Sequence, residues 1–278
     1  MAKKTFKWTN LYLLLVFVLL YAPIMYLIFY SFNDGGTMTS FTGFTWDNYT
    51  AVFEDTRLMG IVLDTLLVAL LSSLLATIIG TLGAIGVYLM KNRKTRNTLL
   101  SMNNILMVSP DVIIGASFLI LFTFIGFRLG FASVLLSHVA FSIPIVVLMV
   151  LPKLQEMNPT MIKAAHDLGA NNWQVLTKII LPAITPGILA GYFMAFTYSL
   201  DDFAVTFFVT GNGFSTLAVE IYSRARQGVS LEINALSTLM FLFALILVVG
   251  YYFIQQYSIS KKHKQQHGRK GKEAVTML

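Results

Sequence analysis

Residues 163–182 read KAAHDLGANNWQVLTKIILP and lie between two long apolar stretches. Helix formers precede Gly169, and Ala164, Ala165 and Leu168 share one helical face because they stand at i, i+1 and i+4. Small side chains on that face let another backbone approach closely. Gly169 suits a helix end followed by a sharp turn, since glycine takes a positive φ without a Cβ clash.

This segment is therefore predicted to form a short helix over 157–168, a turn, and a second short helix over 173–180. Pro182 and Pro186 are expected to limit or kink the second helix, because proline lacks a backbone donor. The product is a convex knob that fits a groove in another protein. The alternative interpretation is an ordinary amphipathic surface helix followed by an ordinary turn.

The composition is that of an integral membrane protein. Hydrophobic residues make up 56% of the chain and charged residues 12%, whereas soluble domains have about 25% charged residues. A transmembrane β-barrel would show short alternating segments instead of long apolar runs. The predicted fold class is an all-α polytopic membrane protein. Six apolar stretches are long enough to cross ~30 Å of hydrocarbon: 11–32, 61–89, 99–125, 132–151, 187–209 and 235–257.

The chain is predicted to have one transmembrane domain over 1–260, with the loop at about 153–182 on one membrane side. A basic tail, 261–278, is expected to lack fixed structure. The first apolar run is too long for a signal-peptide core, and no small-residue cleavage site follows it. It is therefore expected to be a retained span. The absence of cysteine excludes disulfides and thiolate chemistry.

Basic residues predict the orientation of the chain. With the N-terminus inside, 16 of the 20 Lys and Arg residues fall in cytoplasmic segments, and only Arg57, Arg128, Arg224 and Arg226 fall outside. An excess of Lys and Arg marks cytoplasmic loops. Both termini and the loop at 153–182 are thus predicted to be cytoplasmic. The net charge of +7 reflects this bias and the tail, so no nucleic-acid partner is expected.

Three acidic residues fall within the predicted spans away from their ends: Asp111, Asp201 and Asp202. A charged side chain at the bilayer centre costs about 2.5–3.5 kcal/mol on the lenient insertion scale. The six spans contain no Lys or Arg, so these carboxylates have no permanent basic partner. Pro110 also interrupts the helix beside Asp111, and irregular backbone at that depth normally lines a cavity. The pattern predicts a hydrated path of negative potential that suits a cation.

Aromatic residues near the acidic pair are candidates for contacts with that cation. Tyr198 and Phe203 could provide cation–π contacts to an ammonium group. Structural roles remain open: Asp111 could cap a half-helix, and Asp202 could be protonated or bonded to a neighbouring backbone. His138 is expected to be a hydrogen-bonded packing residue. Gly80, Gly83 and Gly86 form a small-residue stripe typical of close helix packing.

The spacing in 163–182 is Ala-Ala, three residues, Gly, nine residues, then Ile-x-Leu-Pro. It resembles the EAA loop of ABC-importer permeases. Ser109-Pro110-Asp111 and Leu200-Asp201-Asp202-Phe203 further resemble the spermidine/putrescine importer permeases of the PotC type, over about 11–257. The resemblance implies a type I ABC-importer permease fold in a bacterial cytoplasmic membrane. It also implies a second homologous permease subunit, a cytoplasmic ATPase dimer and an extracytoplasmic polyamine-binding protein, besides contact with membrane lipid.

The resemblance also implies which residues couple the chain to its ATPase. These are Lys163, Ala164, Ala165, Asp167, Gly169, Leu181 and Pro182. Lys163 stands where the family motif begins with Glu, which puts any salt bridge from that position in doubt. No G-x-x-x-x-G-K-[ST] motif is present, so ATP and Mg are expected on the partner. No catalytic residue and no metal site are predicted.

Two other functions remain open. One is an ABC permease for another small solute, although an oxyanion path would need basic linings that the spans lack. The other is a proton- or sodium-coupled secondary transporter that uses the membrane acids. The predicted coupling loop and the lack of an obvious internal repeat argue against it. No His cluster or Ser/His/Asp set in the spans indicates a membrane enzyme.

Overall fold

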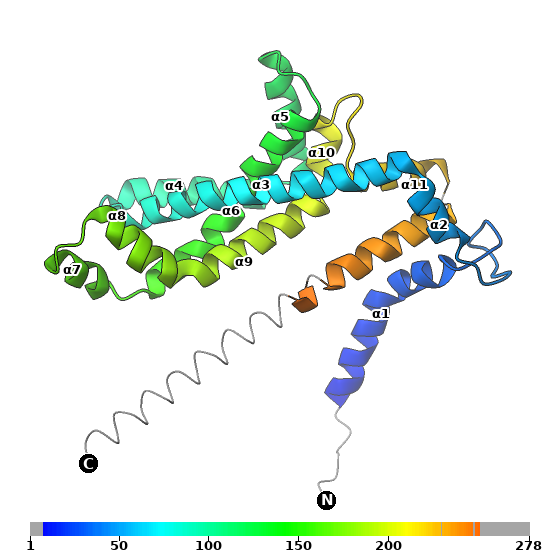
Figure 1. Ribbon diagram of the computed structural model, residues 1–278, viewed down its shortest axis with the longest axis horizontal. Coiled ribbons are helices and arrows are strands. Elements are labelled where there is room, and N and C mark those ends of the chain that lie inside the picture. Colours follow the sequence, from blue (N-terminus) through cyan, green and yellow to red (C-terminus); the bar gives the residue numbers. More distant parts are fainter. Residues whose placement is uncertain (1–7, 229, 247, 251–278) are drawn as a thin grey trace, which may run out of the picture. The chain divides into compact units, whose positions relative to one another are not determined.

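The computed structural model describes residues 8–228, 230–246 and 248–250 (Figure 1). Within them the chain is helical, and the only extended pairing is an isolated bridge between Asn33 and Phe44. The all-α prediction is confirmed. The basic tail at 261–278 and the end of the predicted span 235–257 lie outside the described residues.

The chain divides into two compact units, one of residues 1–55 with 224–278 and one of residues 56–223. In the second unit, α3 (Thr56–Leu89), α6 (Phe131–Glu156) and α9 (Leu181–Leu200) pack against one another. Figure 1 shows α7 (Thr160–Asp167) and α8 (Asn172–Val175) at one end of this bundle. Toward the other end, α10 (Ala204–Val209) follows α9.

Small residues allow α3 and α6 to approach closely. Ala76 and Ala84 are fully buried, and a Cβ on Gly80 would lie 2.8 Å from the Cβ of Val146 and 3.1 Å from the carbonyl oxygen of Ile143. The predicted close packing is confirmed at Gly80. At Gly83 and Gly86 an added Cβ would meet no described atom within 4 Å, so these two residues do not support the packing within this chain.

The third predicted span, 99–125, is not one continuous helix. It consists of α4 (Arg93–Val108) and α5 (Asp111–Phe124), which are bent by 105° at Ser109-Pro110. Pro110 has no N–H to donate, and the residue before a proline is driven out of the α region. Ser109 accordingly has ψ of 137°. The predicted break at Pro110 is confirmed, and it is a sharp turn between two helices.

The fifth predicted span, 187–209, is also wrong in its bounds. Helix runs from Asn172 through α8, a π-helical turn η1 (Leu176–Ile180) and α9, and it ends at Leu200. Pro182 does not end it, because η1 replaces the i→i−4 bonds there with longer ones, such as Leu181 N–H to the Leu176 carbonyl. Residues 201–203 then break the chain before α10.

The other unit contains α1 (Trp8–Tyr30), α2 (Asp47–Glu54) and a helix over Leu231–Gly250 that includes one undescribed residue. The Asn33 side chain organises the loop between α1 and α2, since its amide donates to the carbonyls of Thr37 and Ser40. The predicted short helix at 217–222 exists and is longer, as α11 (Leu217–Gln227).

Among the described residues, five helices are long and apolar enough to cross a membrane, or six if α4 and α5 count as one bent span. They are Asn10–Tyr30, Thr56–Leu89, Phe131–Glu156, Asn172–Leu200 and Leu231–Gly250. The chain is a multi-pass helical membrane protein.

Replacing Gly80 tests the contact between α3 and α6. We expect Gly80→Val to destabilise the protein by about 1–3 kcal/mol, because the new side chain overlaps Val146. The thermal unfolding midpoint of the purified protein would fall by several degrees. Gly83→Val is the matched control on the open face of the same helix, and an equal fall in both variants would contradict the packing argument.

Candidate functional site

A glycine-centred turn ends α7. Gly169 has φ of +81°, and its N–H donates to the His166 carbonyl at 2.9 Å, while the Ala170 N–H donates to the Ala165 carbonyl at 2.9 Å. These two bonds satisfy carbonyls that the helix end leaves free and form a Schellman C-cap. No described atom would lie within 4 Å of a Cβ on Gly169. Glycine is therefore required for its backbone conformation, which confirms the predicted turn.

A capping box begins the second helix two residues later. The Asn171 side chain accepts from the Gln174 N–H at 2.8 Å, and the Gln174 side chain accepts from the Asn171 N–H at 2.9 Å. Each bond satisfies an amide that α8 cannot satisfy itself. The turn between α7 and α8 is thus fixed at both ends by local sequence.

The predicted coupling residues divide by exposure. Lys163, Ala164, Asp167, Gly169 and Pro182 are exposed, and Leu181 is half-buried. Ala165 is buried and packs in the hydrophobic core with residues of α6 and α9. Ala165 thus seats α7 on its own chain, and the surface that a partner can reach is formed by its neighbours.

Two large apolar side chains flank the turn and are freely exposed. Leu168 is 90% exposed and Trp173 is 70% exposed. Exposed apolar groups next to a rigid polar turn are typical anchors for a partner protein. The helical spacing predicted Leu168 on the face of the first helix, and no sequence pattern predicted a role for Trp173. Its position beside the Asn171 capping box is the signal that marks it.

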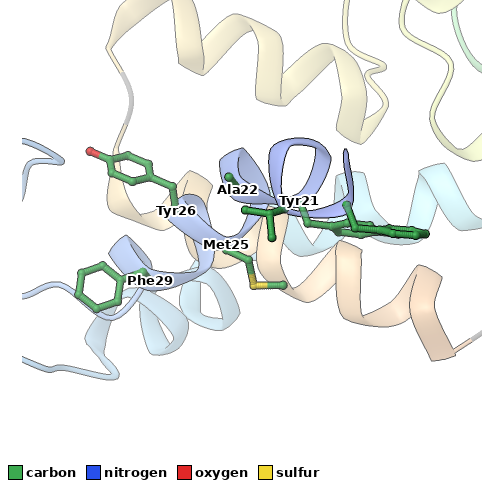
Figure 2. Close-up of a pocket in the computed structure, with 7 residues that line it drawn as sticks. Tyr21, Ala22, Met25, Tyr26 and Phe29 are labelled. Atoms are coloured by element: carbon green, nitrogen blue, oxygen red, sulfur yellow. The ribbon is translucent and has the colours of Figure 1, made fainter. Parts of the chain in front are cut away.

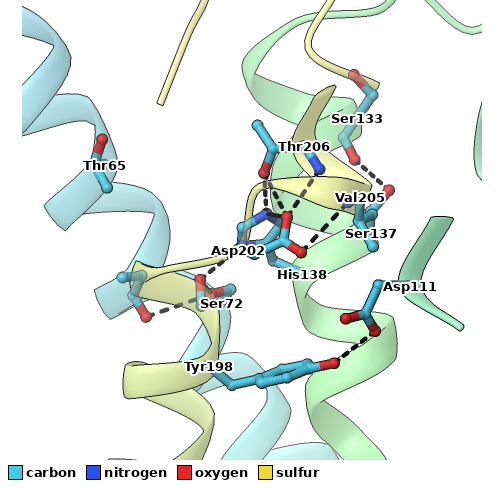
Figure 3. A network of polar contacts seen from close by, with 12 residues as sticks. Thr65, Ser72, Asp111, Ser133, Ser137, His138, Tyr198, Asp202, Val205 and Thr206 are labelled. Atoms are coloured by element: carbon cyan, nitrogen blue, oxygen red, sulfur yellow. Dashed lines mark hydrogen bonds and ion pairs between the residues drawn. The ribbon is translucent and has the colours of Figure 1, made fainter. Parts of the chain in front are cut away.

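The second candidate site lies at the start of α5, the end of α9 and the start of α10 (Figure 3). Asp111 is the first residue of α5 and is half-buried. The Tyr198 hydroxyl, from the last turn of α9, donates to Asp111 Oδ1 at 2.8 Å. The structure thus brings together two residues that are 87 apart in sequence and that were both predicted for the pathway.

Asp201 and Asp202 are adjacent but occupy different environments. Asp201 is exposed, and its carboxylate has no ion pair or side-chain partner among the described residues. The Asp202 side chain is 5% exposed. It accepts from the Val205 N–H at 3.3 Å and from the Thr206 N–H at 2.8 Å. The carboxylate therefore caps the start of α10. The next residue, Phe203, packs on Tyr222 with ring centroids 4.4 Å apart.

Asp202 belongs to a buried network that joins four helices. Its Oδ2 accepts from the Thr206 hydroxyl at 2.8 Å and lies 3.5 Å from His138 Nε2 on α6. His138 Nε2 lies 2.8 Å from the Thr206 hydroxyl, and Nδ1 lies 2.7 Å from the Ser199 hydroxyl. Ser199 also bonds Ser72 on α3 at 2.9 Å. His138 is fully buried and hydrogen-bonded, as predicted.

Each hydrogen bond of this network can be given one donor and one acceptor. With Thr206 donating to Asp202, the Thr206 oxygen accepts from His138 Nε2–H. Nδ1 of a neutral imidazole then accepts from Ser199, which accepts from Ser72. The sequence does not single out Thr206, although Asp202 just before the start of α10 is a capping signal. Nothing in the sequence pairs Ser72 with Ser199.

The two environments give the acidic residues different chemical roles. Asp202 has enough donors around it to remain where it is without a cation from outside. Asp201 is open to an external cation, and among the described residues the Asp111 carboxylate accepts one side-chain hydrogen bond, from the Tyr198 hydroxyl. The pathway role of all these residues, Tyr198 and Phe203 included, stays a prediction.

A shallow apolar depression runs along α1 (Figure 2). It has a volume of about 640 Å³ and includes Tyr21, Ala22, Met25, Tyr26 and Phe29. Its lining comes from one exposed helix face, which suits lipid or a neighbouring helix better than a polar ligand.

Residues 76–264 match the family described as binding-protein-dependent transport system inner membrane component. The chain is 38% identical over 240 residues to the spermidine/putrescine transport system permease protein PotC of Haemophilus influenzae, covering 86% of this chain and 93% of that protein. It is 35% identical over 265 residues to the putrescine transport system permease protein PotI of Escherichia coli, covering 93% of each.

Solved structures share the fold. A chain of a bacterial ABC transporter involved in the import of the acidic polysaccharide alginate matches with a TM-score of 0.70 at 17% identity, covering 89% of this chain and 93% of that one. A chain of the inward-facing MetNI methionine ABC transporter matches with a TM-score of 0.60 at 19% identity, covering 71% of this chain and 95% of that one. The fold is that of a type I ABC-importer permease.

The glycine turn between α7 and α8 gives a test of the knob. In Gly169→Val the left-handed conformation would cost about 1–2 kcal/mol, so α7 and α8 should lose their fixed angle. We expect normal membrane insertion but reduced binding of the ATPase in pull-down of the purified complex. Gly169→Asn is the control, because Asn tolerates positive φ. Full ATPase binding by the valine variant would contradict the role of the turn.

The buried network gives a separate test. Thr206→Val keeps the side-chain shape but leaves the buried Asp202 and His138 with one partner fewer. We expect a loss of about 1–3 kcal/mol in stability, measured as a lower thermal unfolding midpoint. Thr197→Val is the matched control, since that hydroxyl is exposed and bonds only its own helix at Phe193. Equal effects of the two substitutions would show that the network is not the cause.

Proposed function

This chain belongs to the family of binding-protein-dependent transport system inner membrane components, and we propose that it moves polyamines across the membrane. It is a permease subunit of an ATP-driven importer and not itself an enzyme. The observation that supports a polyamine is the exposed Asp201 near the Asp111–Tyr198 pair, in a chain whose apolar stretches 99–125, 132–151 and 187–209 contain no Lys or Arg. Polyamines are flexible chains of ammonium groups, and carboxylates at membrane depth are their natural partners.

The relatives support the same substrate class. Their names include spermidine and putrescine, and they cover nearly the whole length of this chain. We propose that Asp111 and Asp201 each hold one ammonium group in turn as the cation passes. Tyr198 fixes the rotamer of the Asp111 carboxylate, and Phe203, beside the break, offers a ring face to an ammonium group. Asp202, held by His138 and Thr206, positions the break that presents Asp201.

The knob of α7 and α8 is proposed to couple the chain to ATP hydrolysis. Leu168, Trp173 and Ala164 offer an apolar contact next to the rigid Gly169 turn, and Lys163 and Asp167 add charge at its edge. The partner that fits is a cytoplasmic ATPase dimer, which holds ATP and Mg. Closure of that dimer would push the knob and move α9, which continues from α8 through η1.

Two further partners complete the proposed machine. A second homologous permease supplies the other half of the pathway, and an extracytoplasmic binding protein delivers the polyamine. The basic-residue bias supports an orientation with both termini and the knob in the cytoplasm of a bacterial cell.

Charge-removing substitutions test the substrate and the path together. Asp111→Asn and Asp201→Asn keep side-chain shape, so each should assemble normally. Loss of one close cation partner costs on the order of 1–3 kcal/mol, which is about ten- to a hundredfold in transport efficiency. The measurement is spermidine and putrescine uptake into vesicles with all partner subunits, alongside ATPase activity.

Asp34→Asn, in the exposed loop before α2, is the control and should transport normally. Normal uptake by both pathway variants would exclude these acids from the path. Uptake driven by a proton or sodium gradient without ATP would instead indicate a secondary transporter. ATP-driven uptake of another solute, with none of either polyamine, would indicate a different ABC permease.

A further inference from the structure

The α4 helix has a polar stripe that no function described above uses. Asn97, Ser101 and Asn104 stand at i, i+4 and i+7 and therefore share one face. All three are exposed, and their side chains make no hydrogen bond to another described residue. No residue of α4 is fully buried.

Two residues of this stripe, Ser101 and Asn104, lie level with the middle of a helix long enough to span the membrane. The side-chain amide of Asn103 donates to the carbonyl of Pro144 at 3.4 Å, and Pro144 lies in the middle of the membrane-spanning helix α6. Ser101 and Asn104 are within one helical turn of Asn103 and lie at nearly the same level, because the helix rises 1.5 Å per residue. Leu100 and Leu106 pack against the hydrophobic cores, so the stripe lies on a different face from the packed one.

Unpaired amides and hydroxyls do not face hydrocarbon, because nothing there replaces the water they lose. The stripe must therefore be covered by water or by another polar surface. A second feature favours water as the cover of the stripe. The helix breaks at Ser109-Pro110, at the C-terminal end of α4, and Pro110 is exposed. Broken backbone at membrane depth is tolerated where it lines a water-filled cavity. Asp111, which we place in the cation path, follows that break directly.

We infer that Asn97, Ser101 and Asn104 line the cytoplasmic half of the translocation path. Their side-chain oxygens accept hydrogen bonds from the ammonium groups of the cation after it leaves Asp111. This inference rests on the proposed function and extends it from the acids to the exit. Amide and hydroxyl oxygens replace part of an ammonium group's hydration shell without holding it as tightly as a carboxylate. A neutral stripe below an acid therefore suits release of the cation.

Cysteine accessibility tests this, and the chain has no cysteine of its own. Asn97→Cys, Ser101→Cys and Asn104→Cys are made singly in the complete importer, in inside-out vesicles. Each is treated with a cationic, membrane-impermeant methanethiosulfonate, and modification is read on this chain by mass. Met102→Cys is the matched control, because Met102 is exposed on the apolar side of the same helix.

We expect at least two of the three stripe positions to react tenfold or more faster than Met102→Cys. Spermidine with ATP during turnover should slow these reactions at least threefold. Rates no faster than the control would overturn the inference. Reaction in the isolated chain but not in the complete importer would also overturn it, because the stripe would then be an interface with the second permease.

A polarity change provides a second measurement. Asn104→Leu should reduce spermidine uptake about tenfold while the complex assembles, and Asn104→Ser should restore most of it. The unaltered importer is assayed in parallel: if spermidine fails to stimulate its ATPase, the polyamine function is wrong. If spermidine stimulates the ATPase but the stripe stays unreactive, only the exit path is wrong.

Discussion

The membrane excludes any backbone or polar group that lacks a hydrogen-bonding partner, and this constraint explains the architecture of the unit of residues 56–223, which holds both candidate sites. The bundle of α3, α6 and α9 meets it with continuous helices and small residues that pack closely. The chain departs from it at two places, Ser109-Pro110 and residues 201–203. Each departure stands beside a carboxylate, so the irregular backbone and the charge can share one source of water.

The break after α9 shows how one constraint assigns two roles to neighbouring residues. Asp202 points back to the amides of α10 and to His138, and it makes the break stable. Asp201 is left exposed by the same change of direction. In a continuous helix the two side chains would differ only by rotation about the axis, by about 100°. Because the helix breaks here, Asp202 is a buried structural carboxylate and Asp201 is an accessible one.

The segment of α7 and α8, which we propose as the coupling knob, follows a different logic, because its conformation depends on local sequence. Its turn is held by the positive φ of Gly169 and by the reciprocal bonds of Asn171 and Gln174. The helix that follows passes through a π-helical turn before Pro182 and continues as α9 to Leu200. A movement of the knob is therefore applied to the helix whose last turns hold Tyr198 and Ser199. One continuous element joins the two candidate sites.

The sequence by itself determined the all-α membrane class, most span positions, the break at Pro110 and the glycine turn at Gly169. These depend on apolar run length and on the backbone limits of proline and glycine, which are local properties. It also identified Asp111, Asp201 and Tyr198 as residues of interest. Only the tertiary structure decided that α9 ends at Leu200, that Ala165 is buried and that the Asp202 carboxylate contacts His138 and Thr206. Those outcomes depend on which side chains from distant parts of the chain meet, such as Ser72 with Ser199 across 127 residues, and no local pattern specifies such meetings.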